Sequence, residues 1–498
     1  MLDRFLLKLA PGMAAGRAEA RLRHAMTEKR MSLLQRYDAS ETGGRHSGWR
    51  RPATSAAAEI QGGLLGLRNA SRDLVRNNPH ANRAMRVLRS HIAGQGMRPR
   101  PVWPESYSAQ ERKALSLVAR DEWRRFVDGC DVEGRHSFYG QERLGIGTVV
   151  ESGEYLRVWF MVREDSGSWV WRCRVLEGDW LDHQKNEVRP DGTRIVQGVE
   201  FDAIGRRVAY HLHKSDPGDR FARGLGARHD VVRVASEFVD HVYEVLRPGQ
   251  VRGVSWFAPV AVTLRDLDDL AEAELVRKKL EACIAAVVKN ETGSDMPAAA
   301  LSGAKDDTGK LITTSDGKAL ERMTPGMVLQ AKEGWSLDYM TPTSSDGLVE
   351  HMKERLHAVA AGVGTTYAQL TGDLSGASFS SMREGRLEFN KLLDLWQDDL
   401  LVVPSGRPAW QRVMKLAVGK GLLPAVPRAA YTPPKRPWVD PLKDIKAARE
   451  EVDAGWASDQ DMIERTGRDP EEVIEERRLW AEMTAGDDED NSGGSENE

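Results

Sequence analysis

The sequence predicts an α+β fold in which a β-rich domain is followed by long helices. Residues 137–250 hold several segments of β-branched and aromatic residues separated by turns, which is typical of strands. After Trp256 the apolar residues instead recur every three or four positions over long stretches, which indicates helices. The chain has 498 residues, 40% of them hydrophobic, so it can bury more than one core.

Composition and charge exclude several classes of protein. The formal net charge is only −4, with basic and acidic residues mixed, so a broad basic surface for tight, static DNA binding is not expected. Cys130, Cys173 and Cys283 show no CxxC spacing, which indicates a reducing compartment without structural disulfides or a zinc ribbon. No apolar run reaches the length of a membrane span, and the N-terminus lacks the apolar core of a secretory signal, so no membrane partner is expected.

The N-terminal region divides into an arm and a helix. Residues 1–57 are rich in Ala and Arg, with a Gly/Ser/Arg break at ETGGRHSGWRRPATS, and we expect a flexible basic arm that becomes ordered only against partners. Residues 58–94 predict a helix, because Leu64, Leu74 and Leu88 fall on one stripe that packing into a core explains.

Three segments within 137–250 predict strands. They cover residues 155–162, 169–175 and 208–213, and turn signals such as Asp191-Gly192 separate the strand-rich stretches. We therefore expect a mixed β-rich domain, which together with the preceding helix covers residues 58–255.

Two long helices are predicted on either side of a small insert. The first covers residues 256–290 and would be roughly 45 Å long at about 1.5 Å per residue. The second covers residues 344–366, and residues 291–343 between them show two Gly/Asp turns and short alternating segments. A single chain has too little core to cover both helices, so we expect neighbouring copies to contact them. Their apolar faces comprise Leu264, Leu267, Leu275, Leu348, Met352, Leu356 and Val359.

A loop of small residues, 367–382, follows the second helix. It consists mostly of Gly, Ser, Ala and Asp, with Leu374 and Phe379 as its bulky members. A loop of this length inside a domain is usually either functional or disordered, and the residues alone leave both interpretations open.

The C-terminal third is predicted to be mostly helical. A third helix starts near residue 382, within the segment 383–440, and a proline-rich linker follows it. Residues 441–483 predict further helical structure, and residues 484–498 predict a disordered acidic tail.

Catalytic and cofactor motifs do not stand out in the sequence. The string from Gly303 to Leu311 has the wrong spacing for a phosphate-binding loop and a leucine where a hydroxyl is needed, so it predicts a turn. His211 and His213 alternate on one strand face but lack further ligands nearby. The acids Asp266, Asp268 and Asp269 could suggest a two-metal nuclease, but they fit better as helix N-terminal charges. We expect no catalytic, cofactor-binding or metal-binding residues and no cofactor.

Several short strings stand out, in order, from residue 37 to residue 442. They are Tyr37–Arg45 with Trp49, Arg72–Pro79, Gly249–Pro259, Leu370–Leu374 with Ser380–Arg383, and Trp438–Leu442. Together they resemble the corresponding strings of lambda-type phage portal proteins, and the acids after Leu267 and the basic cluster 277–279 continue the similarity.

This resemblance implies a ring, a dodecamer in the capsid, at one vertex of a virion that is assembled in the host bacterial cytoplasm. The ring would conduct double-stranded DNA during packaging and ejection, and it would help to start procapsid assembly. Its implied partners are the terminase large subunit, head-completion and tail connector proteins, and the major capsid and scaffold proteins. The implied parts are a wing (58–255), two stem helices (256–290 and 344–366), a clip (291–343), a tunnel loop (367–382), a helix returning to the wing (383–440) and a crown (441–483).

The resemblance also places the loop of small residues against DNA. Duplex DNA is densely charged, and many basic contacts would hold it still, whereas Gly, Ser and Thr offer weak, exchangeable contacts. The alternatives are another head or tail structural protein, or a DNA-packaging enzyme such as a nuclease or an ATPase. The residues expected to face the channel are Thr371, Gly372, Asp373, Ser375, Gly376, Ser378, Ser380, Ser381 and Arg383.

Overall fold

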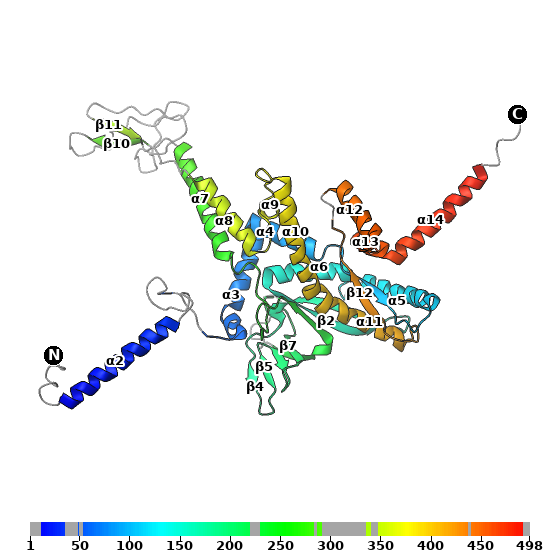
Figure 1. Ribbon diagram of the computed structural model, residues 1–498, viewed down its shortest axis with the longest axis horizontal. Coiled ribbons are helices and arrows are strands. Elements are labelled where there is room, and N and C mark those ends of the chain that lie inside the picture. Colours follow the sequence, from blue (N-terminus) through cyan, green and yellow to red (C-terminus); the bar gives the residue numbers. More distant parts are fainter. Residues whose placement is uncertain are drawn as a thin grey trace, which may run out of the picture. The chain divides into compact units, whose positions relative to one another are not determined.

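The computed structural model describes residues 11–34, 48, 53–219, 230–282, 286–290, 335–339, 347–436 and 440–491 (Figure 1). The chain forms two units, residues 1–55 and residues 56–498. The first unit contains helix α2 (Pro11–Leu34), where the sequence had predicted a flexible arm. That prediction is corrected for these 24 residues: Ala, Arg, Glu and Leu are strong helix formers, and Glu19 pairs with Arg23 one turn later at 2.7 Å.

The second unit contains the remaining helices and all the described strands. Its α-helices are α3 (Ala56–Asn77), α4 (Pro79–Ile92), α5 (Ala109–Gly129), α6 (Phe138–Ser152), α7 (Ala261–Ala282), α8 (Leu348–Gly362), α9 (Tyr367–Thr371), α10 (Phe379–Trp396), α11 (Arg407–Gly419), α12 (Pro441–Asp453), α13 (Asp459–Arg465) and α14 (Pro470–Asn491). Two short 3₁₀ helices are η3 (Gly178–Trp180) and η4 (Ser236–Phe238), and η5 (Gln397–Gly406) is a π-helix. The strands are β1 (Arg98–Val102), β2 (Glu154–Arg163), β3 (Trp169–Glu177), β4 (Glu187–Val188), β5 (Arg194–Val196), β6 (Val199–Phe201), β7 (Arg207–His213), β8 (Val231–Ala235), β9 (Val239–Tyr243), β10 (Ala286–Asn290), β11 (Trp335–Tyr339) and β12 (Arg428–Thr432).

The helix predicted over residues 58–94 is two helices, α3 and α4. Proline has no backbone N–H to donate within a helix, and Pro79 takes the first position of α4, where none is needed. The side chain of Asn78 caps α4 by accepting a hydrogen bond from the backbone of Ala81 at 2.9 Å. The apolar stripe continues across this break because both helices contribute to one core, which includes Leu74 and Leu88.

Two antiparallel sheets form the β-rich part, and the three predicted strands are confirmed as β2, β3 and β7. One sheet has the order β3-β2-β9 and the other the order β4-β5-β6-β7-β8. Buried residues of both sheets, such as Leu156 and Leu176 from the first and Phe201 and Tyr210 from the second, share one hydrophobic core. The observed mixture of sheets and long helices confirms the predicted α+β class.

Two further cores are formed mainly by helices, and each also includes residues of the β3-β2-β9 sheet. The largest joins α3, α4 and α6 to the inner ends of α7 and α8 and to α10. The other is rich in aromatic side chains: Trp123 of α5 lies 5.5 Å from Trp410 of α11 and 5.4 Å from Phe138, measured between ring centroids. Such tilted and edge-on ring pairs add about 0.5–1.5 kcal/mol each beyond their burial.

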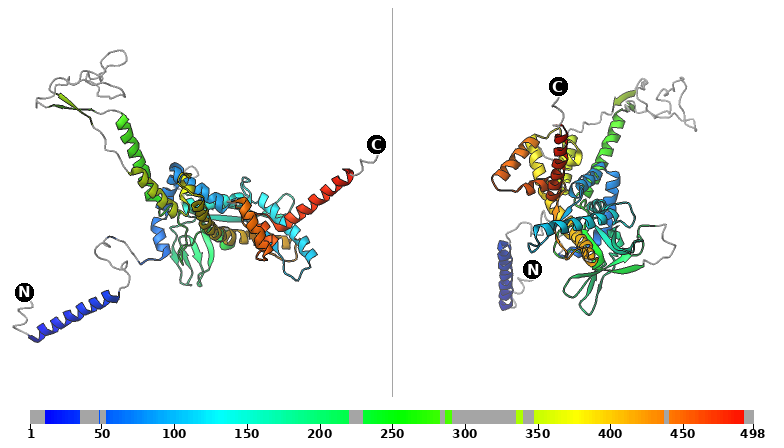
Figure 2. Two further views of the ribbon diagram at one scale, coloured as in Figure 1. Left: turned by 45° about the horizontal axis from the view of Figure 1, so that its top comes forward. Right: turned by 90° about the vertical axis from the view of Figure 1, so that its right-hand side faces the viewer.

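The first long helix is shorter than predicted. A turn segment occupies residues 256–260, helix α7 ends at Ala282, and strand β10 begins at Ala286. The helix was predicted to continue to residue 290, but strand β10 takes its place there. Val287 and Val288 in that strand are β-branched residues, which favour strands over helices. The second helix, α8, covers 348–362 of the predicted 344–366, and α7 and α8 run side by side in all three views (Figures 1 and 2). Of the predicted insert 291–343, only β11, which pairs with β10, lies within the described residues.

Helix α10 continues without a break through η5 into α11, so helical structure covers residues 379–419. Within η5, Ser405 links three buried elements: it donates a hydrogen bond to Glu142 of α6 at 3.0 Å and accepts one from Arg157 of β2 at 2.5 Å. After α11, strand β12 pairs with β1, so that Arg98 faces Thr432. The segment 383–440 is therefore not a single helix, because Pro427, Pro433 and Pro434 cannot continue one.

The predicted helical segment 441–483 forms α12, α13 and the start of α14, and ion pairs join these helices to the rest of the unit. Arg100 of β1 pairs with Glu464 at 2.8 Å, and Arg120 of α5 pairs with Asp469 at 2.9 Å. Helix α14 continues to Asn491, so the prediction of a disordered tail from residue 484 is corrected for its first eight residues. The reason is helix propagation, which adds one hydrogen bond for each residue that joins an existing helix.

Candidate functional site

The loop of small residues is seven residues long, 372–378, and each end is capped. Thr366 and Gln369 form a reciprocal capping box that starts α9, and Gly372, in the left-handed conformation (φ 79°), caps its C-terminal end. Ser378 accepts a hydrogen bond from the backbone N–H of Ser381 at 3.1 Å and so caps α10. The predicted loop, 367–382, was too long because these short capping signals convert both of its ends into helix.

Hydrogen bonds also order the first half of the loop. Asp373 accepts a hydrogen bond from the backbone N–H of Ser375 at 2.9 Å and one from the hydroxyl of Tyr367 at 3.3 Å. The hydrogen bonds from Ser375 are the main reason that the pKa of Asp373 lies below its ordinary value, so its carboxylate is charged at neutral pH. Leu374 between them has 59% of its surface exposed. The loop is therefore an ordered turn that presents small side chains and one large apolar side chain, Leu374, to solvent.

The helix before the loop is anchored on the main core. Leu370 is buried in that core, and the Nε atom of Arg83 in α4 donates a hydrogen bond to the backbone carbonyl of Gln369 at 2.8 Å. The ring of Tyr367 stacks on His357 of α8 with 4.2 Å between centroids. Sequence reasoning missed Arg83 and Tyr367, because a contact between distant elements leaves no local signal. The T-x-x-Q spacing of the capping box was a signal that it could have used.

The structure brings together most of the predicted channel residues, though in different settings. Gly372, Asp373, Ser375, Gly376 and Ser378 belong to the loop itself. The others lie in flanking helices: Thr371 ends α9, while Ser380, Ser381 and Arg383 lie in the first turns of α10.

The predicted stem residues divide into buried and exposed groups. Leu264, Leu267 and Val359 are buried in the chain's own core, and Met352 and Leu356 pack partly against it. Leu348 is half-buried. The argument that one chain cannot cover these helices is therefore wrong for their inner ends, since α3, α4 and α6 already do so. Of the seven predicted residues, Leu275, with 53% of its surface exposed, is the one that leaves a large apolar side chain free for another copy.

A buried charged cluster holds the junction between the sheets and α7. Glu154 at the start of β2 accepts hydrogen bonds from Arg252 at 2.7 Å, from the backbone of Gly253 at 2.7 Å and from His241 at 2.9 Å, and it also pairs with Arg68. Burial alone would raise the pKa of Glu154, but the two arginines and His241 hold it well below its ordinary value.

The backbone at this junction is packed equally closely. A Cβ atom added to Gly253 would lie 2.0 Å from the carbonyl oxygen of Gly153, so only glycine fits there. Together with the charged cluster, this contact fixes the direction in which the chain leaves the sheets for α7. The sequence offered no local signal for this cluster, because its members come from four separate segments.

The alternative metal or nuclease interpretations gain no support from the described residues. His211 contacts Glu200 at 3.0 Å, and Arg233 shares the same carboxylate. Asp268 accepts hydrogen bonds from the side chain of Asn78 at 2.9 and 3.0 Å. Within the described residues, no group of three or more potential ligands could hold a metal ion, and no helix is long and apolar enough to cross a membrane. The string from Gly303 to Leu311 lies outside the described residues.

Comparison with known proteins defines the class to which this fold and loop belong. The model of the phage portal protein family, lambda family, matches residues 42–397. The chain therefore belongs to the lambda family of phage portal proteins, which are structural proteins of the virion located at a capsid vertex.

Two phage portal proteins of similar sequence agree with this assignment. The chain is 27% identical over 421 residues to a probable portal protein of Halomonas phage phiHAP-1, covering 82% of this chain and 78% of that protein. It is 23% identical over 481 residues to portal protein B of Escherichia phage lambda, covering 87% of this chain and 86% of that protein. Among solved structures, a chain of the neck of an empty GTA particle is similar with a TM-score of 0.45 and 14% identity, covering 80% of this chain and 94% of that chain.

Proposed function

We propose that twelve copies of this chain form a ring through which double-stranded DNA enters the capsid during packaging and leaves during ejection. The observation that carries the proposal is the 372–378 loop, which is small, polar and capped at both ends. Its only large side chain is Leu374, and it contains no lysine or arginine. Duplex DNA carries one charge per ~1.7 Å of its axis, so such a surface can touch many phosphates without retaining them.

The anchoring of the loop supports this role. Leu370 and the hydrogen bond from Arg83 hold helix α9 on the main core, and Tyr367 stacks on a residue of α8. A surface that contacts a moving polymer must keep its position, and these contacts supply that stiffness. The buried cluster around Glu154 fixes the direction of α7 in the same way.

The ring would be a scaffold without catalytic activity, assembled in the host bacterial cytoplasm. The partners that we propose are the terminase large subunit, head-completion and tail connector proteins, and the major capsid and scaffold proteins. The segment 291–343, between the two stem helices, is proposed as the docking site for the packaging motor.

Electron microscopy of the purified protein tests the proposal directly. We expect closed rings with a central hole wide enough for duplex DNA, and no turnover of ATP or cleavage of DNA by the same preparation. A protein that stays monomeric with capsid and scaffold proteins present, or that cleaves DNA, would instead favour an adaptor or a packaging enzyme.

A further inference from the structure

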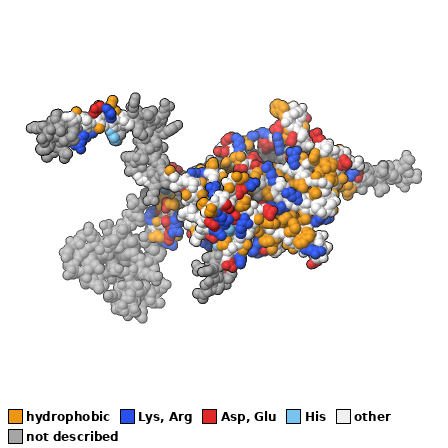
Figure 3. All heavy atoms as spheres, turned by 90° about the horizontal axis from the view of Figure 1, so that it is seen from below, with side chains coloured by type: hydrophobic (Ala, Val, Ile, Leu, Met, Phe, Trp, Pro, Cys, Tyr) orange, Lys and Arg blue, Asp and Glu red, His pale blue; other side chains and the backbone are white. Residues whose placement is uncertain are grey.

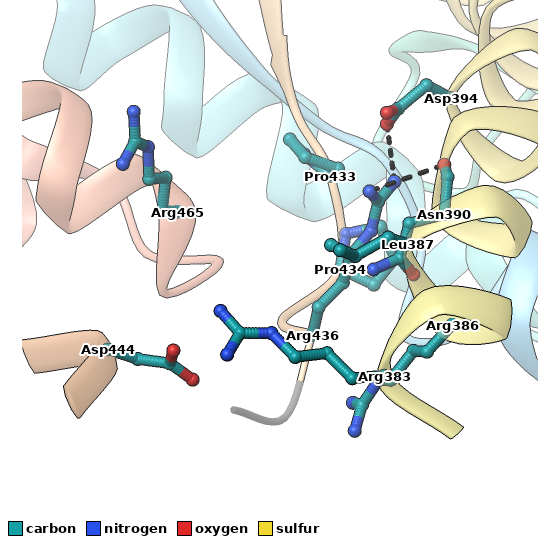
Figure 4. Close-up of a pocket in the computed structure, with 10 residues that line it drawn as sticks. All are labelled: Arg383, Arg386, Leu387, Asn390, Asp394, Pro433, Pro434, Arg436, Asp444 and Arg465. Carbon is teal, nitrogen blue, oxygen red and sulfur yellow. Dashed lines mark hydrogen bonds and ion pairs between the residues drawn. The ribbon is translucent and has the colours of Figure 1, made fainter. Parts of the chain in front are cut away.

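A groove with a volume of about 320 Å³ lies between α10, the linker that follows β12, and helices α12 and α13. Its charged lining consists of Arg383, Arg386, Arg436, Arg465, Asp394 and Asp444 (Figure 4). Four basic and two acidic side chains leave a net charge of 4 − 2 = +2. This is a local feature, since Figure 3 shows acidic and basic side chains interspersed over the face that it presents.

The arginines of the groove differ in how firmly they are held. Arg436 pairs with Asp394 at 2.5 Å, and Arg465 pairs with Glu451 at 2.6 Å. Arg383 is exposed, and among the described residues it has no hydrogen-bond or ion-pair partner. In Figure 4 its side chain extends from α10 into the space that Asp444 faces from α12. One guanidinium group per chain is therefore available to an anion from outside.

The position of Arg383 connects this groove to the loop. It lies in α10, five residues after Ser378, or about 8 Å along the helix at about 1.5 Å per residue. A polymer that touches the 372–378 loop on the side from which Arg383 projects would therefore pass within reach of this long side chain. Arg436 and Arg465 behind it are held by their acidic partners and are not free to close on the ligand.

We propose that this groove binds a backbone phosphate of double-stranded DNA, with Arg383 as the contacting residue. A guanidinium group offers paired donors that match two phosphate oxygens, and such a contact reads no base sequence. A single free arginine per chain can release one phosphate and bind the next, whereas several free arginines per chain would slow the movement of the duplex. This inference rests on the proposed conduit.

The test compares assembled rings of the wild type and Arg383→Gln, using a short fluorescent duplex at several salt concentrations. We expect affinity at low salt to fall roughly five- to tenfold, and the slope of log K against log salt to become shallower by about one for each phosphate that the variant no longer neutralises. Arg383→Lys should keep most of the slope, because the charge remains. Arg124→Gln is the matched control: Arg124 is an exposed arginine of α5 without a partner among the described residues, and its replacement should change neither quantity.

Equal affinity and slope for wild-type and Arg383→Gln rings would overturn the phosphate site, while packaging by those rings would leave the conduit intact. Wild-type rings that neither bind nor package DNA would overturn the conduit itself. A third outcome would also reject the inference. In that case Arg383→Gln leaves the DNA affinity of the ring unchanged, but it lowers the stability of the ring as much as removal of residues 484–498 does. The groove would then hold the acidic segment of a neighbouring copy.

Discussion

The Nε atom of Arg83 lies 2.8 Å from the carbonyl oxygen of Gln369, so a side chain of α4 holds the last turn before the 372–378 loop. The same guanidinium group limits the space beside Gly372, where an added Cβ would lie 3.2 Å from one of its nitrogens. An arginine far away in the sequence thus determines where the loop begins.

Removing this hydrogen bond should loosen the loop without unfolding the chain. Arg83→Met keeps the length of the side chain but leaves the carbonyl without its donor, which costs about 1 kcal/mol. We expect amide hydrogen exchange in residues 367–378 to accelerate about fivefold. Exchange in β2 should not change. Arg86→Met, three residues further along α4, is the control, and equal acceleration in both variants would show that the hydrogen bond does not anchor the loop.

Positive charge added to the loop should slow DNA movement without preventing assembly. Ser375, Gly376 and Ala377 are exposed and lie between the two caps, so replacing all three with lysine leaves Ser378 free to cap α10. The added charges would bind phosphates in a salt-dependent way, so packaging should slow at low salt and partly recover as salt rises. The matching triple glutamine variant should package normally. Normal packaging by the lysine variant at all salt concentrations would mean that the loop does not face DNA.

The two ends of the predicted stem should respond differently to charge. Leu275→Glu places a charge on an exposed position of α7 and should leave the thermal unfolding midpoint of the isolated chain unchanged while preventing ring formation. Leu267→Glu buries a charge in the main core and should cost more than about 4 kcal/mol of stability. Leu117→Glu on α5, where 57% of the side chain is exposed, is the surface control. Intact Leu275→Glu rings in electron micrographs would exclude this position from the interface.

Stability should depend on pH through a buried carboxyl group. Burial raises the pKa of Glu142 from 4.5 to about 7, although Arg157 and Ser405 act in the opposite direction. Between pH 4.5 and pH 7 the Glu142 carboxyl group holds a proton in the folded chain that it releases in the unfolded chain. Its contribution to the free energy of unfolding therefore falls as pH rises through this range. Glu142→Gln removes the titration and should be more stable than the wild type by up to about 3 kcal/mol near pH 8, with little difference near pH 4.

A second buried group provides the control for this measurement. Burial lowers the pKa of His241 to about 4, against the influence of Glu154, so its contribution is lost as pH falls from 6.5 towards 4. His241→Gln should therefore gain stability relative to the wild type as pH falls from 6.5 towards 4, whereas Glu142→Gln should gain it as pH rises from 4.5 towards 7. Denaturant titrations at pH 4 and pH 8 measure these differences in the free energy of unfolding. A stability gain from Glu142→Gln that is equal at the two pH values would contradict the raised pKa of Glu142.

The proposed docking role of residues 291–343 can be tested by excision. Joining Asn290 to Ser344 through a short glycine linker removes β11, but it should leave the two sheets of the β-rich part and the main core intact, since these lie outside the segment. We expect a soluble protein that no longer binds the terminase large subunit in a pull-down. A variant with the segment kept but its two Gly/Asp turns changed to alanine serves for comparison, and undiminished binding after excision would refute the idea.

Much of the fold could be predicted because its signals are local. Alternating β-branched residues identified β2, β3 and β7, and the apolar spacing identified α8. The errors arose where a few residues outweighed a long pattern. Asn78 and Pro79 divided one expected helix into two, and the two serines at Ser378 and Ser381 turned part of an expected loop into helix.

The supporting contacts of the site could not be predicted, because they depend on tertiary structure. In the sequence, Glu154 is simply a polar residue at the start of a strand. In the structure, three basic side chains from different segments contact its carboxylate. Leu264 and Leu275 follow the same helical spacing, and only the positions of α3 and α4 decide that one is buried and the other exposed. Periodicity reveals an apolar face, but not what covers it.

The pairing of β1 with β12 has a consequence for the order of events during synthesis. Arg98 and Thr432 are more than three hundred residues apart, so β1 stays without its strand partner until nearly the whole chain has left the ribosome. At roughly 5–20 residues per second, that interval is on the order of 15 s or longer. Such a distant contact also closes slowly after release, because chain entropy opposes it. A polypeptide that stops before β12 therefore lacks a finished subunit and should not enter a ring, where one defective member would spoil the passage.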